Sequence, residues 1–140
     1  MSVYVLDTDI WTLGWENHVP TRARITARSA SDQVLVSAVT VEEVVTGWLA
    51  SIRKAKTPDR LEFAFDKLLE AVRSLASFEL VSFTRPAIDE FRQLVSLKLN
   101  VRHNDLRIAA IALSAGAVVV TRNLRDFRRV PGLACEDWSA

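Results

Sequence analysis

The chain has 140 residues, a length that suits one domain with a sizeable core. Apolar residues make up 49% and charged residues 25%, a balance that excludes a disordered chain, and a net charge of +1 excludes a strong overall field for nucleic acid or a membrane. The single cysteine, Cys135, excludes an internal disulfide and a cysteine-rich zinc site.

Membrane insertion and secretion are not expected. No apolar run reaches the roughly 20 residues that a membrane helix needs. The apolar start of the chain is interrupted by Asp7 and Asp9, which a signal peptide would not contain. We therefore expect a single cytoplasmic domain over residues 1–140.

Short apolar strands and helices alternate through the first half of the chain. Residues 2–7 and "QVLVS" at 33–37 are typical of buried strands. Helices are predicted over 9–15, Pro20–Ser29 and Thr40–Ala55. The alternation favours βα units.

The second half continues the pattern. A helix is predicted over Asp59–Ala76, with Leu61, Phe65, Leu68, Leu69 and Val72 recurring at helical spacing. The strand "FELVSF" (78–83) and the helix Pro86–Leu99 follow. An apolar helix over Asn104–Ala115, ended by Gly116, precedes a strand at 117–121 and a last short strand near 133–136.

This order predicts a three-layer α/β domain with a mostly parallel sheet. In such sheets, ligands bind beyond the carboxyl ends of the strands. Four carboxylates fall at the edges of apolar elements. Asp7 ends the first strand, Glu43 lies early in the helix after the second strand, Asp105 opens the apolar helix, and Asp126 follows the strand at 117–121. The fold would let them converge at one edge.

Carboxylates that gather in a partly buried site raise one another's pKa unless a cation neutralises them. A cluster of oxygen ligands without suitable Cys or His partners indicates Mg²⁺ or Mn²⁺. Mg²⁺ keeps several waters and borrows phosphate oxygens from its substrate, which suits phosphodiester hydrolysis. No histidine pair is needed, so His18 and His103 are not predicted as general bases.

Each carboxylate also has a simpler interpretation as a helix cap or a solvated charge. Thr40 and Glu43 fit a capping box, and Asp105 could favour a helix N-terminus capped by Asn104. Asp126 could be solvated in a polar loop. Asp9 suits a cap for the helix beginning at Ile10. Taken singly, these alternatives stay open.

Longer segments carry a family resemblance: "YVLDTDIW", "SAVTVEEVVTG" and "NDLRIAAIALSAGAVVVTRNLRDFRRVPGLACEDW". Their order and spacing resemble the PIN-domain ribonucleases, in particular the VapC toxins of bacterial VapBC toxin–antitoxin modules. The resemblance implies a metal-dependent endoribonuclease with a three-layer α/β fold that leaves a 3′ hydroxyl and a 5′ phosphate. The RNA target, tRNA or rRNA, is not indicated by any residue.

The resemblance also assigns roles to residues of this chain. Asp7 and Asp105 match the central metal ligands, and Glu43 matches the acid of the helix after the second strand. Asp126 is expected in the fourth acidic place, with Asn123 and Thr121 as supporting polar groups. The expected cofactor is Mg²⁺, with Mn²⁺ as a substitute.

The expected partners are an RNA substrate, a VapB-like antitoxin and a second copy of the chain. The antitoxin and the homodimer are implied by the resemblance alone. Trp11, Trp15 and Trp48 fit either the core or a groove for an apolar antitoxin helix. Six arginines near the acidic edge fit either phosphate contacts or ordinary surface charge: Arg102, Arg107, Arg122, Arg125, Arg128 and Arg129.

Other functions remain compatible with the sequence. A PIN-fold nuclease in RNA processing outside a toxin module, or one acting on DNA, would share the same site. A response-regulator-like phosphoryl-transfer domain would place a Lys after "VVVT", where Arg122 stands. A non-catalytic metal-binding or interaction domain would use its acids only as caps.

Overall fold

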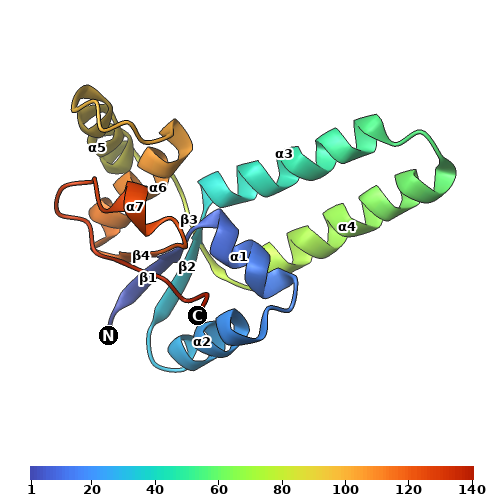
Figure 1. Cartoon of the computed structure of the whole chain (residues 1–140), viewed down its shortest axis with the longest axis horizontal. Coiled ribbons are helices and arrows are strands. Elements are labelled where there is room, and N and C mark those ends of the chain that lie inside the picture. Colours follow the sequence, from blue (N-terminus) through green and yellow to red (C-terminus); the bar gives the residue numbers. More distant parts are fainter.

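A five-stranded sheet crosses the molecule in the computed structural model, which describes residues 1–140 (Figure 1). Its order is β3-β2-β1-β4-β5, and every neighbouring pair is parallel. The predicted α/β fold with a parallel sheet is therefore confirmed. The strands are β1 Val3–Leu6, β2 Gln33–Ser37, β3 Glu79–Val81, β4 Val118–Val120 and β5 Cys135–Glu136.

Helices cover both faces of this sheet. They are α1 Thr8–Trp15, α2 Val19–Ser29, α3 Ala38–Lys54, α4 Pro58–Ala76, α5 Arg85–Ser96, α6 His103–Ala115 and α7 Leu124–Phe127. Successive side chains of β1 alternate between the faces, as strand geometry requires. Val5 packs in the core with α5 and α6, whereas Tyr4 and Leu6 pack in the core with α1 and the end of α4.

The predicted elements are all present, with ends that shift by up to three residues. The four-residue helix α7 was not predicted, because four residues show no periodicity. The strand expected at 78–83 is limited to Glu79–Val81, and as an edge strand it is more exposed than a strand buried on both faces. No helix is both long enough and apolar enough to cross a membrane.

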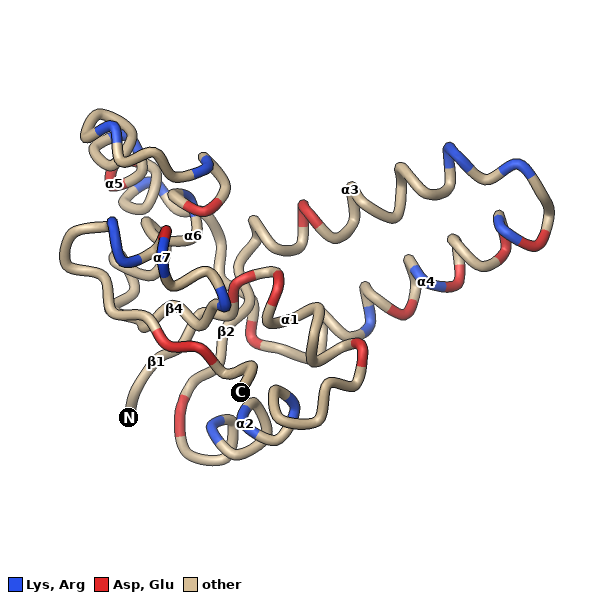
Figure 2. Tube along the Cα trace, in the orientation of Figure 1, with Lys and Arg blue, Asp and Glu red and all other residues tan.

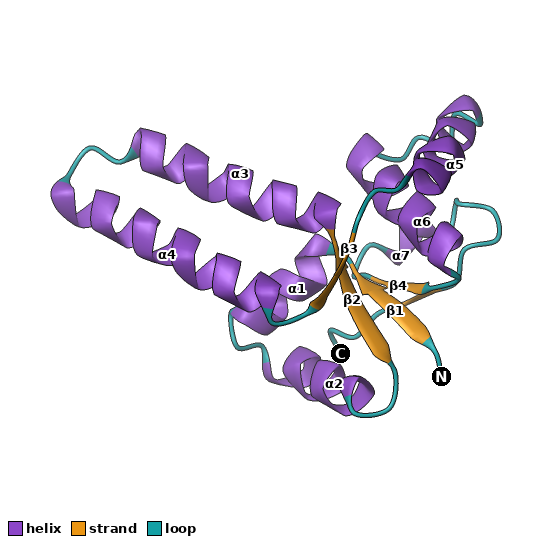
Figure 3. Ribbon diagram, turned by 180° about the vertical axis from the view of Figure 1, so that it is seen from behind, coloured by secondary structure: helices purple, strands orange, loops and turns teal.

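Helices α3 and α4 form a hairpin that projects well beyond the sheet (Figure 3). The apolar residues that recur from Leu61 to Val72 are largely exposed: Phe65 is 53% exposed, and Leu61, Leu69 and Val72 are exposed too. The buried positions of α4 are instead Ala64, Ala71 and Leu75. Because α4 packs beside α3 away from the sheet, its larger apolar side chains have no layer to cover them.

Two leucines of α4 test this arrangement. Leu75→Ala removes a side chain that is 2% exposed and should lower the free energy of unfolding by about 2–5 kcal/mol. Leu69→Ala, on the exposed face of the same helix, should change it by about 0.5 kcal/mol or less. Urea unfolding measures both. A large loss for Leu69→Ala would show that this face is buried in the protein in solution.

Candidate active site

Three of the four predicted carboxylates line one pocket at the carboxyl edge of the sheet. Asp7, between β1 and α1, shares a pocket of about 430 Å³ with Glu43 of α3 and Asp105 of α6. Acidic positions cluster where α1 begins, and basic positions follow on and around α7 (Figure 2). The other lining residues are Thr8, Asp9, Thr12, Leu13, Glu16, Arg102, Arg122 and Asn123. Neither histidine lines this pocket.

Asp7 joins the end of β1 to the start of α1. One carboxylate oxygen accepts a hydrogen bond from the Thr8 N–H at 2.8 Å, and the other accepts one from the Thr121 hydroxyl at 2.8 Å. The backbone N–H of Asp7 donates to the carbonyl of Val120 on β4. The proposed capping role of Asp9 is therefore wrong, because the helix begins at Thr8 and Asp7 occupies the cap position.

Glu43 is held from α1 and does not cap its own helix. The Thr8 hydroxyl donates to Glu43 Oε1 at 2.9 Å and lies 2.9 Å from the Thr40 hydroxyl. Because α3 begins at Ala38, its cap is Ser37, which accepts from the Thr40 N–H. The capping-box interpretation of Thr40 and Glu43 is therefore wrong. Glu42 is exposed and accepts a hydrogen bond from Thr46, as a solvated side chain would.

Asp105 lies in the first turn of α6 and is 3% exposed. Its partner is Arg102, whose Nε and Nη2 donate to the two carboxylate oxygens at 3.4 and 3.1 Å. Asn104 does not cap this helix, because the helix begins at His103 and leaves Asn104 inside its first turn. The Asn104 oxygen instead accepts a hydrogen bond from Arg107.

Asp126 lies in α7, outside the pocket lining. It accepts hydrogen bonds from Asn123 Nδ2 at 2.9 Å and from Arg129 Nη1 at 3.2 Å, so it is paired and not simply solvated. Asn123 lines the pocket, and Thr121 holds Asp7. A supporting role for these two residues stays a prediction. A catalytic role for Asp126 stays a prediction.

Asp9 is a pocket residue to which sequence reasoning gave only a capping role. Its Oδ1 is buried and has no hydrogen-bond partner, and its Oδ2 lies 3.7 Å from Arg122 Nε. The one signal in the sequence is the second acid of "DTD", which falls on the pocket side because α1 starts directly after Asp7.

Burial makes the ionised form of this site costly. Burial, and after it the charges of Asp9 and Asp105, raise the pKa of Asp7 from 3.8 to about 7, against the opposing effect of the hydrogen bonds from Thr121 and Thr8. Burial is also the main reason that the pKa of Asp9 is raised. A bound cation would remove this cost.

The residues fit a hydrated divalent ion better than a fully enclosed one. No three acidic, histidine or cysteine side chains are arranged to hold a metal on their own. Mg²⁺, however, needs only one or two carboxylates and fills its other positions with water and phosphate oxygens. The unpaired oxygen of Asp9 and the raised pKa of Asp7 are what a cation site without its cation would show.

The raised pKa of Asp7 predicts a pH-dependent stability. The folded protein holds this proton more tightly than the unfolded chain does, so the stabilisation is complete below pH 3.8 and is lost as the pH rises through about 7. Asp7→Asn has no carboxyl group to titrate at this position, so it should not show that loss of stability. Between pH 5 and pH 8, metal-free wild type should lose roughly 1–3 kcal/mol more than Asp7→Asn. Urea unfolding in EDTA measures this; parallel pH profiles would contradict it.

The chain is similar to known proteins over nearly its whole length. A model of the PIN domain family matches residues 4–133. Ribonuclease VapC2 of Rickettsia felis is 25% identical, over 97% of this chain and 98% of the relative. The tRNA(fMet)-specific endonuclease VapC of Salmonella typhimurium is 29% identical, over 99% of each.

Solved structures show the same fold. DNA-bound VapBC from Salmonella typhimurium contains a chain with a TM-score of 0.77 and 28% identity, and 99% of each chain is covered. VapBC2 from Rickettsia felis, bound to a promoter DNA fragment, has a chain with a TM-score of 0.78 at 24% identity, covering 97% of this chain and 98% of that one. Since the family model spans nearly the whole chain, this protein belongs to the PIN domain family.

Proposed function

We propose that this protein is an endoribonuclease toxin that depends on Mg²⁺, or on Mn²⁺ in its place, and that a VapB-like antitoxin neutralises it. The observation that carries the proposal is the convergence of Asp7, Glu43 and Asp105 on one pocket. Relatives that match almost the whole chain are named as ribonucleases. Phosphodiester hydrolysis is the chemistry that such an oxygen-rich pocket suits.

Each pocket residue has a separate role in the proposed reaction. Asp7 and Asp105 would hold the ion, which supplies an activated water and offsets charge on the phosphate. Thr121 and the Thr8 N–H fix the orientation of Asp7, and the Thr8 hydroxyl fixes Glu43. An RNA phosphate would enter beside Arg122, whose side chain is half exposed at the pocket. Cleavage would leave a 3′ hydroxyl and a 5′ phosphate.

The substrate is proposed as cellular RNA, with tRNA or rRNA as the target. One full-length relative carries tRNA(fMet) specificity in its name. A PIN nuclease that processes RNA outside a toxin module would have the same pocket, so cleaved products separate the two. A non-catalytic interaction domain would cleave nothing.

Cleavage of total bacterial RNA tests the activity. With Mg²⁺ or Mn²⁺ the protein should release discrete fragments, and EDTA should abolish them. Asp7→Asn, Glu43→Gln and Asp105→Asn should each reduce the rate by about 100-fold or more, beyond the 10- to 100-fold typical of a residue that only orients a ligand. Asp126→Asn should also reduce it if Asp126 fills the fourth acidic place.

The matched control is Asp66→Asn, an exposed acid of α4 away from the pocket, which should cleave like wild type. Fragments that persist in Asp7→Asn would come from a contaminating nuclease. No cleavage by folded, antitoxin-free wild type, with no stabilisation by either metal, would exclude the nuclease function.

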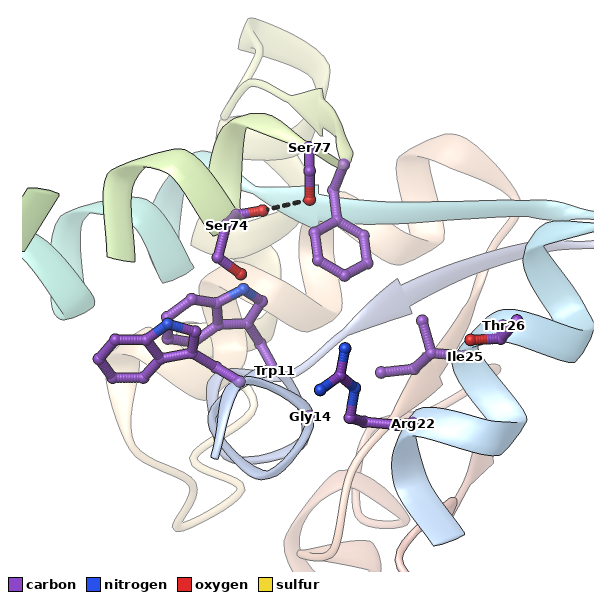
Figure 4. Close-up of a pocket in the computed structure, with 9 residues that line it drawn as sticks. Trp11, Gly14, Arg22, Ile25, Thr26, Ser74 and Ser77 are labelled. Carbon is purple, nitrogen blue, oxygen red and sulfur yellow. Dashed lines mark hydrogen bonds between the residues drawn. The ribbon is translucent and has the colours of Figure 1, made fainter. Parts of the chain in front are cut away.

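A second pocket offers a place for the antitoxin. It has a volume of about 360 Å³ between α1, α2 and the end of α4 (Figure 4). Trp11 is buried and stacks on Trp15 at 5.3 Å between ring centroids, and both tryptophans line the pocket. Trp48 packs edge-on against Trp15 and does not line it. Solved relatives are complexes of toxin with antitoxin.

We propose that an apolar helix of the antitoxin enters this pocket, and that the toxin is a homodimer. Thr26→Trp would fill the pocket from the exposed face of α2. It should weaken binding of the antitoxin encoded beside this gene by tenfold or more, without changing RNA cleavage. Thr46→Trp, on the exposed side of α3, is the control. Calorimetry measures affinity, and sedimentation measures the dimer. Equal affinities for both variants would place the antitoxin elsewhere.

A further inference from the structure

Asp105 already has a cationic partner from its own chain. Nη2 of Arg102 donates to Asp105 Oδ1 at 3.1 Å, and Nε donates to Oδ2 at 3.4 Å. The guanidinium thus engages both oxygens of a carboxylate side chain that is 4% exposed, while its own side chain is 71% exposed. A second pocket arginine, Arg122, makes a looser contact, 3.7 Å from Asp9.

This pairing competes with the proposed metal. A divalent ion on Asp105 would share the oxygens that the fork of Arg102 engages, and two cations on one carboxylate repel each other. Binding of the ion would therefore favour release of Arg102 from Asp105.

Few contacts hold the Arg102 side chain in place. The residue lies just before α6, at the cap position, and its largely exposed side chain has no hydrogen-bond partner other than Asp105. Once released, the guanidinium remains at the pocket, because Arg102 is one of its lining residues. A planar fork that has lost a carboxylate is suited to bind two oxygens of a phosphate.

We propose that Arg102 has two positions: it neutralises Asp105 before the metal binds, and it binds an RNA phosphate after the metal displaces it. This inference rests on the proposed nuclease function and adds a phosphate-binding residue to it. It makes metal and RNA binding mutually favourable, because RNA gives the displaced guanidinium a new partner.

The variant Arg102→Gln tests both positions, because it should strengthen metal binding and weaken RNA binding. Without RNA, calorimetric titration with MnCl₂ or MgCl₂ should show an affinity roughly three- to tenfold tighter than wild type, since a competing charge-assisted hydrogen bond is gone. For RNA cleavage at saturating metal, KM should rise about tenfold with a smaller change in kcat. The slope of log KM against log salt should fall by about 0.7, the share of one phosphate on a single strand.

The matched control is Arg85→Gln. Arg85 is an equally exposed arginine that pairs with Asp89 on its own helix, outside the pocket, so metal affinity, KM and salt slope should stay at wild-type values. Arg102→Lys keeps the charge without the fork and should fall between wild type and Arg102→Gln. It also serves as the test variant if Arg102→Gln does not fold.

The outcomes separate the two proposals. Unchanged or weaker metal affinity in Arg102→Gln, in a protein whose wild type binds metal and cleaves RNA, overturns the role of Arg102 and leaves the nuclease intact. Tighter metal affinity with an unchanged KM and salt slope overturns the phosphate position. Wild type that neither binds metal nor cleaves RNA overturns the proposed function itself.

Discussion

The burial of Asp7 among other acids is the constraint on which the rest of the site depends. Its carboxylate lies where β1 passes into α1, with Asp9 and Asp105 close enough to raise its pKa. Such a group is costly when charged and unaccompanied. Hydrogen bonds offset part of this cost, because the Thr121 hydroxyl and the Thr8 N–H each donate to one oxygen of the Asp7 carboxylate. The remaining cost is the physical basis of the proposed cation site.

The sheet order explains why the acids meet. β1 lies in the centre, with β2 and β3 on one side and β4 and β5 on the other. The chain therefore reverses direction of sheet growth between β3 and β4, and a crevice opens beyond the carboxyl ends of the strands at that switch point. Asp7 follows β1, Thr121 follows β4, and α3, which brings Glu43, follows β2. Parallel pairing alone brings these residues to one edge.

Helix α1 contributes to both the acidic pocket and the tryptophan pocket. Thr8, in its first turn, donates to Glu43 in the acidic pocket, whereas Trp11 and Trp15 line the other pocket with α2 and α4. An occupant of the tryptophan pocket would therefore contact the helix whose first residues shape the acidic one. The projecting hairpin of α3 and α4 extends beyond both and leaves an apolar face of α4 uncovered (Figure 3).

The local sequence pattern was enough to predict most helices and strands and to single out the acidic residues. Continuous apolar runs predict the strands, and helical spacing predicts six of the seven helices. Acids at the edges of apolar elements predict that Asp7, Glu43 and Asp105 meet, although the same argument included Asp126, which lies outside the pocket. Long-range contacts decided the rest. Periodicity marks an apolar face of α4 but cannot say whether another layer covers it, and here none does.

The starts of the helices also show what local pattern predicts and what it leaves to long-range contacts. Helices α1 and α3 begin one or two residues earlier than predicted, so their caps are Asp7 and Ser37. Glu43 is therefore not part of a cap, and it accepts a hydrogen bond from Thr8, 35 positions earlier in the chain. The pairing of Arg102 with Asp105 and the unpaired oxygen of Asp9 likewise depend on side-chain placement. The sequence by itself determined which groups could form the site. Only the tertiary structure decided which of them face one another, because hydrogen bonds and burial depend on distances that sequence spacing does not define.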